Sequence, residues 1–144
     1  MWSKADILLP AAAMVLLTAV VWLRLYVVRL AEIGEKKLDP QSIRNSVLGA
    51  SAFERVEPSD NFKNLFEVPV LFYALCASLA AWDHVTGFFV IGAWLFVALR
   101  AVHSAIHLTY NKVMHRFYAY AAGTVLVFAL WAVFAFRLLA QRAV

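Results

Sequence analysis

The chain has 144 residues, of which 64% are hydrophobic and only 15% are charged, and its formal net charge is +4. A soluble domain averages roughly 45–50% apolar and about 25% charged residues, and a chain this short cannot bury such an excess of apolar surface. The composition therefore excludes a soluble globular protein. The basic residues lie at the ends of apolar runs, which indicates membrane orientation rather than a nucleic-acid partner.

Uncharged apolar runs occupy residues 7–23, 68–82, 85–99 and 117–136. A helix needs about 20 residues to cross a hydrocarbon core of ~30 Å, so the two middle runs must take in polar residues at one end. We predict an all-α integral membrane four-helix bundle, a single domain over residues 1–144. Its spans should cover approximately residues 7–30, 61–82, 85–108 and 116–137. The first run is flanked by both Lys4 and Asp6, which favours a retained span over a cleaved signal peptide.

A hydrophilic loop is predicted over residues 32–60, between the first two spans. Gly34 should end the first helix, and Asp39-Pro40 should begin a short surface helix, because Asp is favoured at an N-cap and Pro at the first helical position. The lone cysteine, Cys76, lies inside an apolar run and is interpreted as a small buried hydrophobe.

Basic residues predict the orientation of the protein in the membrane. One side carries those of the first and third loops, which are Lys36, Lys37, Arg44, Arg55, Lys112 and Arg116. The opposite side carries only Lys4, Arg137 and Arg142. By the positive-inside rule, loops 1 and 3 should be cytoplasmic and both termini extracytoplasmic. In a bacterium, the membrane would be the inner membrane.

Polar side chains gather at the cytoplasmic ends of three spans. The third span carries a stripe at helical spacing, formed by Arg100, His103, Ser104, His107 and Asn111. The second carries Lys63, Asn64 and Glu67, and the fourth begins with Arg116 and Tyr120. Ionisable residues at membrane depth normally face the bundle interior, so these clusters predict one polar, cation-rich cavity. Pro69 should kink the second helix within a turn of Glu67.

Other interpretations of these residues stay open. Glu67 with Lys63 or Arg100 can form a purely structural interhelical salt bridge. Arg116 can serve as an anchor that reaches the lipid headgroups. As a site, the cavity suits a small anion that carries an amine for Glu67, with an apolar co-substrate entering from the lipid. A metal held by His103, His107 and Glu67 is the competing hypothesis, opposed by the repulsion that Arg100 and Arg116 would exert on a cation.

Two segments resemble the MAPEG superfamily, the membrane-associated proteins of eicosanoid and glutathione metabolism, and in particular its bacterial members. They are Asp60-Asn61-Phe62-Lys63-Asn64-Leu65-Phe66-Glu67 and Arg100-Ala101-Val102-His103, continued by His107, Arg116 and Tyr120. The family pattern has a basic residue, Asn and then Glu on the second helix. Arg-x-x-His follows on the third helix, and an Arg and a Tyr four apart begin the fourth.

The resemblance implies a homotrimer that binds glutathione, its co-substrate, between subunits near the cytoplasmic face. Lipophilic electrophiles or hydroperoxides would be the other substrates. Arg116 would lie near the thiol, as the catalytic residue. The residues that would hold glutathione are Arg29, Lys63, Asn64, Glu67, Arg100, His103, His107 and Tyr120.

The sequence departs from the family pattern at three positions. Lys63 replaces an Arg that many members have, His107 replaces a Tyr, and Phe117 stands where one branch has a Ser beside the thiol. Some members bind lipid without catalysis. The hypotheses are therefore a glutathione-dependent transferase or peroxidase, a non-catalytic lipid-binding or scaffolding trimer, and a metal-dependent membrane enzyme.

Overall fold

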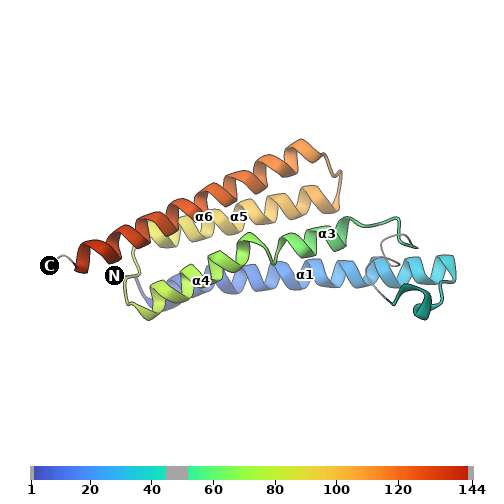
Figure 1. The fold of residues 1–144 in the computed structure, drawn as a ribbon, viewed down its shortest axis with the longest axis horizontal. Helices are drawn as coiled ribbons and strands as arrows, with labels where there is room; N and C mark the ends of the chain where they lie inside the picture. The colour runs from blue at the N-terminus through green and yellow to red at the C-terminus, as the bar shows by residue number, and fades with distance from the viewer. Residues whose placement is uncertain (1, 45–51, 143–144) are drawn as a thin grey trace.

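The computed structural model describes residues 2–44 and 52–142, and all regular elements in these ranges are helical (Figure 1). In chain order they are α1 (Lys4–Lys36), η1 (Pro40–Ile43), α3 (Glu57–Asn64), α4 (Val68–Ala81), α5 (Gly87–Leu108) and α6 (Val113–Arg142). Four stretches of the described chain are long and apolar enough to cross a membrane: Lys4–Lys36, Glu57–Ala81, Gly87–Leu108 and Val113–Gln141. The predicted all-α four-helix membrane architecture is confirmed.

Successive spans run antiparallel, so that both termini lie at one end of the bundle (Figure 1). The α4–α5 turn lies at that same end, and the α1–α3 and α5–α6 connections lie at the other. This alternation follows from the four consecutive spans that the sequence predicted. We call the end that holds the α1–α3 and α5–α6 connections the loop end.

Helix α1 begins where the Asp6 carboxylate accepts a hydrogen bond from the Ser3 amide at 2.7 Å. The prediction that Gly34 ends this helix is wrong, because α1 continues to Lys36 and Lys37 adopts the left-handed conformation with φ 49°. The last turns of α1 are joined to the segment before α3, because the buried Glu32 carboxylate accepts a hydrogen bond from the Glu54 amide at 2.7 Å. Asp39 begins a helix as predicted, although it is a 3₁₀ turn, with the Asp39 carboxylate accepting from the Gln41 amide at 3.0 Å.

The second span is broken between α3 and α4. Residues 65–67 lie outside both helices, and Pro69 lies in the first turn of α4. A proline there has no amide hydrogen to donate, which matches the start of a helix. The predicted kink near Glu67 is therefore present as a complete break, which leaves Glu67 at the N-cap of α4 with φ −93° and ψ −103°.

The core lies between the four spans. Phe72 of α4 stacks on Phe96 of α5 with ring centroids 4.6 Å apart, and Met14 and Val127 are fully buried beside them in the same cluster. Large apolar side chains elsewhere stay exposed, among them Leu16, Ile91, Val125 and Phe136. An outer surface of this kind is expected of helices that face lipid, since hydrocarbon contact carries no hydrophobic penalty.

Candidate functional site

A pocket of about 390 Å³ lies between α3, α5 and α6 towards the loop end. Its lining residues are Asp60, Asn64, His103, His107, Val113, Arg116, Phe117 and Tyr120. The polar ends of three helices thus meet, as the spacing of their side chains predicted. We call this hollow the polar pocket.

Arg116, at the start of α6, is held in the polar pocket by two neutral acceptors. Its Nη1 donates to Asn111 Oδ1 at 2.8 Å and to His107 Nε2 at 2.9 Å. Asn111 can reach it because the short turn before α6 puts Asn111 in the left-handed conformation, with φ 47°. No carboxylate forms an ion pair with Arg116 among the described residues. Its positive charge is therefore not paired with a carboxylate in this part of the structure.

His103 ties α5 to the first turn of α6. Its Nδ1 donates to the backbone carbonyl of Arg116 at 2.9 Å, which fixes the tautomer and leaves Nε2 as an acceptor. That Nε2 is buried and has no hydrogen-bond partner among the described residues. His103 therefore has one buried nitrogen without a partner among these residues, whereas His107 uses its Nε2 on Arg116.

Arg100 lies beneath the polar pocket and does not line it. Its side chain is fully buried, its Nη2 donates to the Tyr120 carbonyl at 2.9 Å, and its guanidinium lies 4.4 Å from the Tyr120 ring centroid. Gly123 makes the room, because a Cβ at that position would lie 3.0 Å from Arg100 Nη2. Arg100 Nε and Nη1 have no partner in the described chain, so a buried cation underlies the site.

Glu67 reaches the site through Tyr120, whose hydroxyl donates to Glu67 Oε2 at 3.0 Å. The structural alternative, a salt bridge from Glu67 to Lys63 or Arg100, is absent from the ion pairs of the described residues. Lys63 instead lies 3.5 Å from Asp60 Oδ1. The break between α3 and α4 explains this, since it turns Glu67 out of helical register with Lys63.

Two of the predicted glutathione-binding residues lie away from the polar pocket in a single chain. Lys63 is exposed. Arg29 lies in a separate hollow of about 300 Å³, where its guanidinium lies 3.7 Å from the Phe53 ring centroid. The polar pocket thus gathers Asn64, His103, His107, Arg116 and Tyr120, with Glu67 and Arg100 next to it.

Three residues in or next to the site were not predicted as binding or catalytic residues. Asp60 lines the polar pocket one helical turn before Asn64, and that i, i+4 spacing was the signal that could have identified it. Phe117 lines the pocket beside Arg116. The fully buried Asn61 accepts a hydrogen bond from Ser104 at 3.1 Å, which joins α3 to α5.

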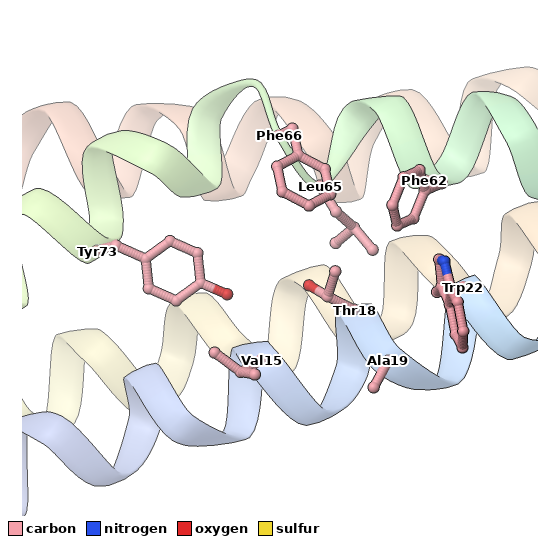
Figure 2. A pocket seen from close by; sticks show the side chains of 8 residues that line it. All are labelled: Val15, Thr18, Ala19, Trp22, Phe62, Leu65, Phe66 and Tyr73. Carbon is pink, nitrogen blue, oxygen red and sulfur yellow. The ribbon is translucent and has the colours of Figure 1, made fainter.

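An apolar pocket of about 540 Å³ lies between α1 and the α3–α4 break (Figure 2). Its lining residues are Val15, Thr18, Ala19, Trp22, Phe62, Leu65, Phe66 and Tyr73. Figure 2 shows Leu65 and Phe66 at the break, opposite Thr18 and Val15 of α1. Phe66 thus lines the apolar pocket, while the next residue, Glu67, joins the polar pocket through Tyr120.

A metal site receives no support from the described residues, which contain no cluster of three or more potential metal ligands. His107 Nε2, one of the nitrogens that the metal hypothesis needs, already accepts a hydrogen bond from the Arg116 cation. Glu67, the third residue of that hypothesis, is hydrogen-bonded to Tyr120.

In a comparison with known families, residues 7–136 match a model described as the MAPEG family. The chain belongs to the MAPEG family. This membership supports, in general terms, a membrane-associated function related to glutathione or eicosanoids, in an integral multi-pass protein. No curated protein and no solved structure matches the chain. The finer assignment of activity therefore depends on the site itself.

Proposed function

We propose that this MAPEG protein is a glutathione-dependent membrane transferase or peroxidase that acts on lipophilic electrophiles or hydroperoxides. The observation that carries the proposal is Arg116, a cation that lines the polar pocket and is held there by His107 and Asn111 rather than by an acid. A volume of about 390 Å³ falls within the range of about 300–1,000 Å³ that is usual for small-molecule sites.

Arg116 is suited to stabilising a thiolate. A thiol with a pKa of about 8.5 is mostly protonated at neutral pH, and an adjacent cation favours the reactive thiolate. A guanidinium cannot lose its own proton to the thiolate that it stabilises. Because the two groups that hold Arg116 are neutral, its charge is available to the sulfur of a bound thiol.

The remaining polar groups complement the rest of glutathione, which carries two carboxylates and one amine. Asp60 in the polar pocket and Glu67 beside it are acceptors for the amine. Asn64 and Tyr120 offer neutral hydrogen bonds to the peptide groups. The carboxylates need further cations, and Arg29 and Lys63 lie outside the polar pocket of their own chain. We therefore propose a homotrimer in which a neighbouring subunit supplies them.

The apolar pocket gives the lipophilic co-substrate a place within the membrane-spanning region. It has a larger volume than the polar pocket, about 540 Å³. Leu65 and Phe66 of the break line it, and Glu67 of the same break is hydrogen-bonded to Tyr120 of the polar pocket. That larger volume also favours the second candidate function, a non-catalytic lipid-binding or scaffolding trimer. The two candidates differ in one requirement. Only the catalytic function requires that the thiol of bound glutathione be ionised.

The deciding experiment is an ultraviolet titration of the thiolate of glutathione bound to purified protein. In the wild type, the thiol pKa of bound glutathione should lie below that of free glutathione. Arg116→Ala should restore the ordinary value while glutathione still binds, and Lys112→Ala, a change at an exposed residue outside the pocket, is the matched control. Arg116→Lys tests whether charge alone suffices. Glutathione that binds the wild type with an unshifted thiol would reject catalysis and leave the lipid-binding function.

The proposed trimer has a separate test. Native mass spectrometry of detergent-solubilised protein should give three times the chain mass of 16.1 kDa. Mixing Arg29→Ala subunits with Asn64→Ala subunits should restore glutathione binding, since a mixed trimer contains interfaces with both residues intact. A monomer or dimer would contradict the shared site.

A further inference from the structure

A second polar pocket, of about 210 Å³, lies between α1, the start of α3 and the end of α5. Its lining residues are Arg24, Val28, Arg55, Glu57, Pro58, His107, Leu108 and Thr109. We call it the arginine pocket. It shares only His107 with the polar pocket, so its charged residues have no part in the proposed glutathione chemistry.

The charges of the arginine pocket come from two segments that are far apart in the sequence. Arg24 is on α1, Arg55 precedes α3, and Glu57 is its first residue. Arg55 is paired with Glu35 at 2.6 Å, whereas Arg24 forms no ion pair among the described residues. Arg24 is exposed, so its guanidinium is accessible to an anion. A ligand with one phosphate and one ammonium would pair with Arg24 and with the Glu57 carboxylate, because guanidinium pairs well with phosphate oxygens. Arg55 adds a second positive charge nearby, with both of its Nη atoms already donating to Glu35.

The depth of the arginine pocket matches the headgroup layer of a membrane. Arg24 is the first charged residue after the apolar run of residues 7–23, a run about 25 Å long at about 1.5 Å per residue. Helix α5 ends at Leu108 and α3 begins at Glu57, next to the same pocket. The end of the apolar run of α1, the end of α5 and the polar helix α3 thus meet at this pocket.

The surface of α1 before Arg24 is suited to acyl chains. Leu16, Val20 and Leu23 are all exposed, at 66%, 52% and 56%. A phospholipid whose phosphate lies at Arg24 would place its hydrocarbon along these side chains. A soluble phosphate ester would gain nothing from them, so the apolar surface favours a lipid as the source of the phosphate.

We propose that the arginine pocket binds the headgroup of a phosphatidylethanolamine-type lipid, with its phosphate on Arg24, next to Arg55, and its ammonium on Glu57. The primary ammonium can donate hydrogen bonds to the carboxylate, and a quaternary choline ammonium cannot. A preference for ethanolamine over choline therefore distinguishes a specific headgroup site from an arginine that contacts the phosphate of any phospholipid.

The test is native mass spectrometry of delipidated protein, titrated with short-chain phosphatidylethanolamine or phosphatidylcholine of equal chain length. The wild type should bind phosphatidylethanolamine more tightly. Glu57→Gln should remove this preference, and Arg24→Gln should weaken both lipids about tenfold, which corresponds to the loss of one charged contact. Arg24→Lys should retain part of the binding, and Arg44→Gln, at an exposed arginine outside the pocket, should change nothing.

Several results would overturn the proposal. The first is equal affinity of the wild type for the two lipids. The second is an Arg24→Gln variant that binds the lipids as tightly as the wild type. Inorganic phosphate at millimolar concentration should fail to displace the lipid. Displacement would assign the pocket to a soluble phosphate instead. If the protein does not bind glutathione, the lipid test still applies, because neither Arg24 nor Glu57 lines the polar pocket.

Discussion

The Tyr120 hydroxyl donates a hydrogen bond to Glu67 Oε2 at 3.0 Å, and thereby joins the start of α6 to the break between α3 and α4. The opposite side of the same residue contacts Arg100, which donates to the Tyr120 carbonyl and lies near its ring. Tyr120 therefore stands between an acid and a buried cation that do not form an ion pair.

This geometry predicts which residues are energetically coupled. In the cycle Glu67→Gln with Tyr120→Phe, we expect a coupling of about 0.5–1.5 kcal/mol, the usual net contribution of one hydrogen bond. The cycle Glu67→Gln with Arg100→Met should be closer to additive, because Tyr120 separates the two charges. Thermal unfolding in detergent measures both. A larger coupling in the second cycle would establish a direct Glu67–Arg100 pair in solution.

Close packing of α5 on α6 makes Gly92 intolerant of a side chain. A Cβ there would lie 2.8 Å and 3.2 Å from the two Cδ atoms of Leu130, so Gly92→Ala should cost about 1–3 kcal/mol of stability through overpacking. Gly34, in α1, has nothing within 4 Å of its Cβ position. Gly34→Ala should therefore be neutral or gain up to about 1 kcal/mol from helix propensity. Equal effects of the two substitutions on thermal unfolding would argue against this packing.

Glu32 should hold the segment before α3 against the end of α1. Its buried carboxylate accepts the amides of Glu54 at 2.7 Å and Arg55 at 3.4 Å, and lies 3.0 Å from Lys36 Nζ. In Glu32→Ala these amides lose their acceptor, so their hydrogen exchange should accelerate. Glu35→Ala removes only an exposed partner of Arg55, and should leave the Glu54 amide protected. Unchanged exchange in Glu32→Ala would contradict the role of Glu32.

The orientation in the membrane remains a prediction from the basic residues. Single cysteines at Ser3 and Gln41, both exposed, can be placed in a Cys76→Ala background and treated with an impermeant thiol reagent in intact cells. We expect labelling at position 3 and protection at position 41, because loop 1 is predicted to be cytoplasmic. Permeabilised cells should label both positions and serve as the control. The reverse pattern in intact cells would invert the topology.

The sequence by itself determined the four spans and the face of α5 that is turned inward. Long uncharged runs have few alternatives to crossing a bilayer, and Arg100, His103 and His107 repeat at helical spacing, so a straight helix buries all three. The Pro69 break could likewise be predicted, because a missing amide hydrogen acts locally.

Only the tertiary structure decided which residues meet across helices. The rotation of each helix and the break at residues 65–67 joined Glu67 to Tyr120, added Asp60 to the polar pocket and left Arg29 in a separate hollow. The hydrogen bonds from Arg116 to His107 and Asn111 likewise depend on the turn before α6, in which Asn111 has a left-handed backbone conformation. Helical periodicity fixes positions within one helix, whereas contacts between helices depend on packing that no single segment encodes.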